Sequence, residues 1–259
     1  MSTAQDEIRK GVALVTGAGG GLGRALAREL AARGMAVAGF GRRKESLAET
    51  RALIGESFMG VQVDVADPAA VRDGFAEIRR ALGPVTVLVN NAAVYPRRDF
   101  LDETAESFGA TVDVNLGGVI ACTRAALDDM CETGVGRILN VATFADVAPI
   151  PASSAYSVSK GAARVLTRAL VADLGDRFPD IVIGDWMPGM LATSMGVPHG
   201  LAPEEAARWG AELALWHDPS LTGAVFERDR ELLPPRGLKR KVKDLLLFRR
   251  PPQPRRLGT

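Results

Sequence analysis

The segment T-G-A-G-G-G-L-G, residues 16–23, places five glycines among eight residues and directly follows the apolar run at 12–15. Leu22, Leu26 and Leu30 recur at helical spacing, so the glycines lie between an expected strand and an expected helix. Glycine loses more backbone entropy on folding than any other residue, and such a run therefore reflects a local requirement. A helix N-terminus offers unpaired N–H groups and the positive end of the helix dipole. The segment predicts an anion site, for which pyrophosphate is the usual ligand in this context.

Apolar strand-like runs alternate with helical stretches as far as about residue 227. The expected strands are 12–16, 35–40, 61–65, 85–89, 137–141, 181–186 and 224–227, and the later expected helices include one running through Asn115 toward Cys131 and one over 154–178. Strands that are apolar throughout and separated by helices indicate a parallel sheet covered on both faces. We expect one α/β domain, residues 1–235, with a Rossmann-type, doubly wound, seven-stranded parallel sheet in three layers. Ligands should then bind at the carboxyl ends of the strands.

Composition excludes several classes of protein. No run approaches 18 apolar residues, so no transmembrane helix is expected, and the polar start 1–10 lacks the apolar stretch of a secretory signal. We expect a cytoplasmic protein. Cys122 and Cys131 fall in one expected helix, roughly 13 Å apart and too far for a disulfide. His199 and His217 have no ligand-like neighbours, so no metal site is expected.

The C-terminal extension, residues 236–259, differs in charge from the rest of the chain. It contains nine Lys/Arg and one Asp, a local charge of +8, which leaves −7 on residues 1–235. Its first part has the pattern of a short basic helix with an apolar face. Docking on a neighbouring, acidic subunit is favoured over attachment to a membrane surface. Nucleic-acid binding ranks third because few aromatic residues are interleaved for stacking.

The glycine spacing T-G-x-x-x-G-x-G resembles that of the short-chain dehydrogenase/reductase family, and further motifs carry the same resemblance. They are N-N-A-A at 90–93 (the family has N-N-A-G), Y-S-V-S-K at 156–160 for Y-x-x-x-K, P-G-M-L-A-T at 188–193 for P-G-x-x-x-T, Asn115, and Asp64 after the third strand. The match extends over about residues 10–227. It implies a nicotinamide-dependent oxidoreductase that acts on a carbonyl/alcohol pair, in a homodimer or homotetramer.

The resemblance implies a catalytic set of Asn115, Thr143, Tyr156 and Lys160. Tyr156 and Lys160 lie one helical turn apart and share a face. An adjacent ammonium is expected to lower the phenol pKa from its ordinary ~10, so that Tyr156 can protonate a carbonyl oxygen or deprotonate an alcohol. By resemblance, Lys160 would also bind ribose hydroxyls, and Asn115 would hold a water in a proton relay. As an isolated pair, tyrosine and lysine would more commonly lie on a solvated helix face.

Thr143 stands thirteen residues before Tyr156, where the family normally has serine. Threonine keeps the hydroxyl but adds a methyl group and a stiffer χ1, so we expect activity with a narrower substrate pocket. Ser153 and Ser154 lie nearer the tyrosine but suit capping of the next helix.

Arg42 decides the expected cofactor. Gly41 stands where NAD-specific relatives place an acidic residue, and the guanidinium that follows can hold the 2′-phosphate of NADP. NADP(H) is therefore favoured over NAD(H), the alternative being a solvated arginine pair at the start of the next helix. The expected cofactor-binding residues are Thr16, Gly17, Gly19, Gly20, Gly21, Leu22, Gly23, Gly41, Arg42, Arg43, Asp64, Val65, Asn91, Ala92, Ala93, Tyr156, Lys160, Pro188, Gly189 and Thr193.

The substrate should lie over the ends of the fourth, fifth and sixth strands, between the loops 94–100, 144–155 and 187–201. Apolar side chains in these loops suggest a partly apolar ketone or secondary alcohol. Arg97 and Arg98 could meet an anionic group, although exposed loop arginines are more often solvated. A rival interpretation is a regulatory or scaffold protein that binds the dinucleotide without turnover. The complete set of Asn115, Tyr156 and Lys160 argues against it.

Overall fold

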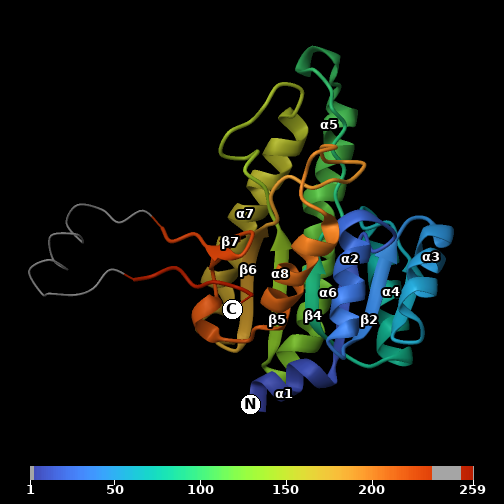
Figure 1. Ribbon diagram of the computed structural model, residues 1–259, viewed down its shortest axis with the longest axis vertical. Coiled ribbons are helices and arrows are strands. Elements are labelled where there is room, and N and C mark those ends of the chain that lie inside the picture. The colour runs from blue at the N-terminus through green and yellow to red at the C-terminus, as the bar shows by residue number, and fades with distance from the viewer. Residues whose placement is uncertain (1–2, 235–251, 259) are drawn as a thin grey trace, which may run out of the picture.

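A computed structural model describes residues 3–234 and 252–258 (Figure 1). Within these residues the chain forms one sheet in the order β3-β2-β1-β4-β5-β6-β7-β8. The strands are β1 (Val12–Thr16), β2 (Ala36–Gly41), β3 (Phe58–Gln62), β4 (Val85–Asn90), β5 (Gly136–Val141), β6 (Ile181–Met187), β7 (Val225–Glu227) and β8 (Arg230–Glu231). The expected α/β class and doubly wound order are confirmed, because neighbours from β3 to β7 are parallel.

The expected count of seven strands is corrected by β8, which pairs antiparallel with β7. Two residues, Arg228 and Asp229, connect these strands, and Arg228 has a φ of 49°. A positive φ is what a tight two-residue hairpin connection requires. No apolar alternation marks this two-residue strand, which explains why sequence patterning did not detect it.

Helices cover both faces of the sheet, as expected for three layers. They are α1 (Thr3–Lys10), α2 (Gly21–Ala32), α3 (Lys44–Ile54), α4 (Pro68–Ala81), α5 (Ala105–Val112), α6 (Gly118–Thr133), α7 (Ser154–Leu174) and α8 (Pro203–Leu215). One apolar core lies between the sheet and α2 and α8, which are on the near face in Figure 1. A second core lies between the sheet, α4 and α6, with residues of α7 packed against it.

Three expected boundaries differ from the structure. The third strand is Phe58–Gln62 rather than 61–65, although Val63 still donates its N–H to Gly41 O. The single helix expected around Asn115 is three consecutive segments, with a π-helical turn at Asp113–Gly117 between α5 and α6. Such a turn inserts one residue and re-aims the side chains beside it. The helix expected to reach residue 178 ends at Leu174.

The end of the C-terminal extension returns to the domain. Leu257 is buried in the first core, and the Arg255 guanidinium lies 2.7 Å from the Glu231 carboxylate. An isolated bridge joins Arg256 to Arg230. The basic helix expected at the start of the extension lies outside the described residues.

The sequence predicted neither a transmembrane helix nor a metal site. In the described part of the chain no helix is long and apolar enough to cross a membrane, and no group of three or more potential metal ligands gathers there. Cys122 and Cys131 are both free, which confirms that they do not form a disulfide.

Candidate active site

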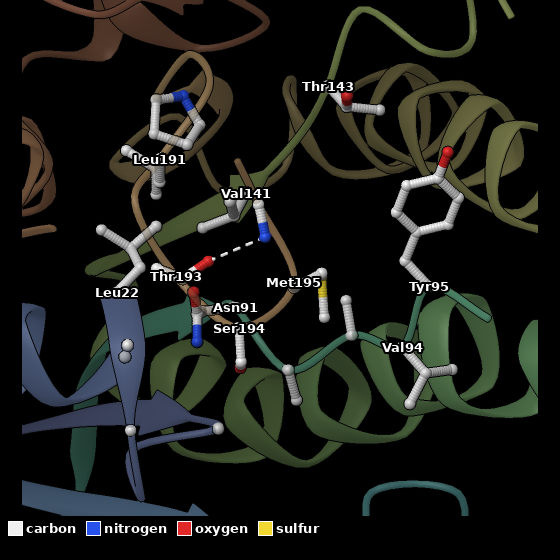
Figure 2. Close-up of a pocket in the computed structure, with 18 of the residues that line it drawn as sticks. Leu22, Asn91, Val94, Tyr95, Val141, Thr143, Leu191, Thr193, Ser194 and Met195 are labelled. Atoms are coloured by element: carbon white, nitrogen blue, oxygen red, sulfur yellow. Dashed lines mark hydrogen bonds between the residues drawn. The ribbon is translucent and has the colours of Figure 1, made fainter. Parts of the chain in front are cut away.

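A cavity of about 1100 Å³ opens at the carboxyl ends of the strands, where the chain order reverses between β1 and β4. Ligands of doubly wound sheets bind at this reversal. The cavity exceeds the ~300–1,000 Å³ of ordinary small-molecule pockets, so it has room for a large ligand or two ligands together. Every expected site residue lines it except Thr16 and Asn115. In Figure 2, Tyr95 and Thr143 lie on one side of the cavity, and Leu22 and Leu191 on the other.

The glycine turn forms one wall of this cavity. Gly17 has a φ of 71°, and a Cβ on Gly23 would lie 2.2 Å from Gly17 O, so the helix start packs directly on the turn. A Cβ on Gly20 would meet no protein atom within 4 Å. Gly20 is also the N-cap of α2 and offers no side-chain cap to the helix N–H groups. This open, uncapped helix end fits an anionic group such as pyrophosphate.

Thr16 lies behind the cavity wall. Its hydroxyl oxygen accepts hydrogen bonds from the N–H groups of Asn91 and Ala92, both at 2.9 Å, and Asn91 Nδ2 donates to Thr16 O at 2.8 Å. These bonds tie the end of β1 to the end of β4. Thr16 therefore shapes the site without lining it, which differs from the direct contact that the sequence suggested.

Lys160 is almost fully buried, and its ammonium donates to Val141 O at 2.9 Å. Burial lowers the pKa of Lys160 to about 8, and the nearby carboxylate of Asp185 opposes that lowering. Lys160 and Tyr156 both line the cavity from α7. Together they present a phenol and an amine to the cavity.

The phenol of Tyr156 differs from the sequence expectation. Burial raises the pKa of Tyr156, Tyr95 contributes in the same direction, and a hydrogen bond with Thr143 lowers it in part. We expected Lys160 to lower this pKa, but Lys160 is not among the groups that shift it, and desolvation of the phenolate in the protein interior is the largest effect. Thr143, however, lies beside Tyr156 as the resemblance implied.

Asn115 is fully buried below the cavity, on the π-helical turn. Its Oδ1 accepts from Val94 N at 2.8 Å, and its Nδ2 donates to Val94 O at 2.9 Å and to Ser159 Oγ at 3.0 Å. The amide thus joins the loop after β4 to α7. Both N–H donors are engaged by protein, so Asn115 has at most one acceptor lone pair left for the water that we expected it to hold.

Ser153 and Ser154 do not cap α7 as expected. The N-cap residue Ser153 makes no side-chain cap bond; its hydroxyl bonds to Ile150 O and to Ser157 Oγ instead. The hydroxyl of Ser154 is buried without a partner among the described residues.

A row of buried polar side chains runs beneath α7. Asn90, Asn140 and Asp185 are register neighbours on β4, β5 and β6. Asn90 Nδ2 donates to Asn140 Oδ1 at 2.8 Å, Asn140 Nδ2 donates to Thr167 Oγ1 at 3.0 Å, and Thr167 Oγ1 donates to Asp185 Oδ1 at 2.7 Å. Burial raises the pKa of Asp185 to about 6, and the Thr167 hydrogen bond opposes this. The sequence analysis assigned no role to this carboxyl, because residues 181–186 were interpreted only as an apolar strand.

Tyr95 is a second residue that sequence reasoning missed. Its ring stacks on that of Tyr156, with centroids 4.4 Å apart and an interplanar angle of 26°. It lines the cavity directly after the N-N-A-A motif, but no spacing rule marks it. Arg228, which also lines the cavity beside Gly189, was missed for the same reason.

A comparison with protein families matches residues 11–202 to a model described as short chain dehydrogenase. The chain belongs to the short-chain dehydrogenase/reductase family. Membership supports an oxidoreductase that acts on CH–OH groups with a nicotinamide dinucleotide, NAD or NADP. The open helix end at Gly20 fits the pyrophosphate of either dinucleotide.

Relatives within this family agree with that assignment. The chain is 36% identical over 190 residues to the short-chain reductase protein NovJ of Streptomyces niveus, covering 72% of this chain and 71% of that protein. It is 34% identical to carbonyl reductase [NADPH] 2 of Sus scrofa, covering 76% and 78%. A crystal structure of a short chain dehydrogenase from Bacillus anthracis superposes with a TM-score of 0.78 at 23% identity, covering 86% and 96%. This last likeness concerns the fold.

Proposed function

We propose that this member of the family is an NADP(H)-dependent oxidoreductase that interconverts a ketone or aldehyde with an alcohol. The observation that carries the proposal is the phenol of Tyr156, hydrogen-bonded to Thr143, in a cavity that Lys160 and the glycine turn also line. When bound, the dinucleotide would supply the hydride acceptor or donor. The glycine turn, Asp64, Asn91 and Thr193 would hold it.

In this proposal Tyr156 exchanges a proton with the substrate oxygen. The hydroxyl of Thr143 forms a hydrogen bond with the phenol of Tyr156. It also orients the substrate oxygen. Lys160 has a pKa of about 8, so at neutral pH it is largely an ammonium, which would bind ribose hydroxyls of the dinucleotide. Asn115 holds the loop after β4 against α7 and thereby fixes the phenol relative to the cavity.

The preference for NADP(H) is argued from two guanidinium groups. Arg42 and Arg43 line the cavity where β2 ends, and neither has an ion-pair partner among the described residues. An added Cβ at Gly41 would lie 3.1 Å from the Leu47 side chain, so the position where an acidic residue would bind the ribose is crowded. Uncompensated cations favour a 2′-phosphate over a 2′-hydroxyl.

A panel of ketones and alcohols assayed with NADPH and NADH tests the proposal. We expect hydride transfer with NADPH preferred, and we expect Arg42→Ala to lower kcat/KM for NADPH about 10- to 100-fold with little change for NADH. Arg51→Ala is the matched control, because Arg51 pairs with Glu56 and does not line the cavity. A strong NADH preference would refute the cofactor assignment. Dinucleotide binding without turnover on any substrate would favour a regulatory or scaffold protein.

A further inference from the structure

Three side chains form a continuous stack from α7 into the mouth of the cavity. Tyr95 stacks on Tyr156 at 4.4 Å between ring centroids, and the Arg97 guanidinium carbon lies 5.6 Å from the centroid of Tyr95. The sum of these two distances is an upper limit on the separation of the guanidinium from the ring of Tyr156. The guanidinium of Arg97 therefore lies no more than about 10 Å from the ring centroid of Tyr156.

Arg97 and its neighbour Arg98 differ in their surroundings. Arg98 donates to the buried carboxylate of Glu103 at 3.0 Å, which neutralises its charge within the protein. Arg97 lines the cavity and has no carboxylate partner among the described residues, where its side chain donates one hydrogen bond, to Gly196 O at 3.0 Å. A guanidinium has five N–H donors, so most of those of Arg97 remain available.

The anchor of Arg97 is a tightly packed turn. Gly196 N donates to Thr193 O at 3.0 Å and to Thr193 Oγ1 at 3.1 Å. A Cβ on Gly196 would lie 1.9 Å from Leu191 O, so no side chain fits at this position of the turn. The guanidinium is thus held between the Tyr95 ring and the Gly196 carbonyl, which reduces the entropy that binding an anion would cost.

Apolar side chains contribute much of the same lining. Phe144, Ile150, Met190 and Met195 line the cavity and are all partly or largely exposed. An oriented guanidinium beside apolar side chains can discriminate between substrates, because a carboxylate can pair with it in a fork-shaped arrangement while the remaining substrate lies on the apolar side chains.

We propose that Arg97 binds a carboxylate of the substrate, with Tyr95 as the platform that positions it. The substrate is then an oxo acid or hydroxy acid anion with an apolar segment. This inference rests on the proposed function for the site of the chemistry, and it adds the substrate class.

Matched pairs of aliphatic oxo acids and their methyl esters test the substrate class. We expect the wild-type protein to prefer the acids, and we expect Arg97→Gln to lower kcat/KM for acids about 10- to 100-fold, mainly through KM, with esters unchanged. Arg98→Gln is the matched control, since it removes the same charge one residue away, and it should keep the preference. Tyr95→Phe retains the aromatic ring and should also keep the preference for acids. Equal activity on acids and esters, or equal losses for both in Arg97→Gln, would overturn the proposal.

Equilibrium binding separates failure of this inference from failure of the proposed function. Octanoate and methyl octanoate are titrated calorimetrically into wild type and Arg97→Gln in the presence of NADPH. Tighter binding of octanoate that weakens about 10- to 100-fold in the variant supports the anion site, whether or not any substrate is turned over. Binding of octanoate that is unaffected by the variant, or undetectable in the wild type, would refute it.

Discussion

Replacement of Asp185 by asparagine should make the protein more stable at alkaline pH. Asp185 is 4% exposed on β6, and its Oδ1 accepts from Thr167 Oγ1 at 2.7 Å. Asparagine has the same shape and keeps that acceptor oxygen, but it carries no charge. The variant therefore removes the desolvation cost of the carboxylate while retaining the packing around it.

The raised pKa of Asp185 sets the size of the effect. Moving the pKa from its ordinary 3.8 to about 6 means that the folded state favours the protonated carboxyl by about 3 kcal/mol. At low pH this preference stabilises the folded state. Because the folded state holds the proton more tightly, this stabilisation is fully present below pH 3.8 and is lost as the pH rises through about 6. Between pH 5 and pH 8 the free energy of unfolding of the wild type should fall by about 1.4 kcal/mol because of Asp185, and that of Asp185→Asn should show no such fall.

Urea unfolding, followed by tryptophan fluorescence at several pH values from 5 to 8, measures this difference. Thr167→Val is a useful second variant, because loss of the hydrogen bond raises the pKa of Asp185 further and moves the loss of stability to higher pH. If the free energies of unfolding of the wild type and of Asp185→Asn differ by the same amount from pH 5 to pH 8, the reasoning is refuted.

The same variant should change the pH dependence of activity. Asp185 opposes the lowering of the Lys160 pKa by burial, so its neutralisation should bring that pKa below about 8. Lys160 would then lose its proton at a lower pH. The decrease in kcat on the alkaline side of the pH profile should therefore also begin at a lower pH. A stabilised but less active enzyme would indicate that the buried carboxylate is retained for function.

Three further predictions concern other parts of the site and the core. Gly23→Ala should weaken NADPH binding at least about tenfold and lower Tm, because the added Cβ would lie 2.2 Å from Gly17 O; titration and thermal unfolding measure both. Thr143→Ala should lower kcat about 10- to 100-fold and move the pH profile upward, because it removes the hydrogen bond that lowers the pKa of Tyr156, whereas Thr143→Ser should retain activity. Burial raises the pKa of the Cys122 thiol to about 12, so iodoacetamide at pH 8 should alkylate the half-buried Cys131 first, as mass spectrometry would detect.

Local patterns predicted the fold well because they depend on short-range rules. The apolar run at Val12–Thr16, the glycines and the periodic leucines of α2 specify a strand, a turn and a helix within about 20 residues. Motif spacing then placed Tyr156, Lys160 and Thr143 in one cavity. The two-residue strand β8 was missed because its pairing depends on a turn and on Arg256, which is distant in sequence.

Features that depend on contacts between distant segments could not be predicted. The stack of Tyr95 on Tyr156 joins the loop after β4 to α7, and no pattern in either segment specifies it. The environment of Tyr156 also depends on the whole fold: burial raises its pKa more than the Thr143 hydrogen bond lowers it. The different surroundings of Arg97 and Arg98 are invisible in a sequence where they are adjacent.

The central claim is that Tyr156 exchanges the substrate proton in an enzyme that transfers hydride. The most direct test is single-turnover reduction of a ketone substrate by wild type and Tyr156→Phe, both saturated with NADPH, with NADPH affinity measured on the same samples. Phenylalanine keeps the ring that stacks on Tyr95 and removes the hydroxyl. We predict unchanged NADPH affinity and a rate at least about 100-fold lower, consistent with loss of a general acid. A variant that reduces the ketone at the wild-type rate would contradict the account.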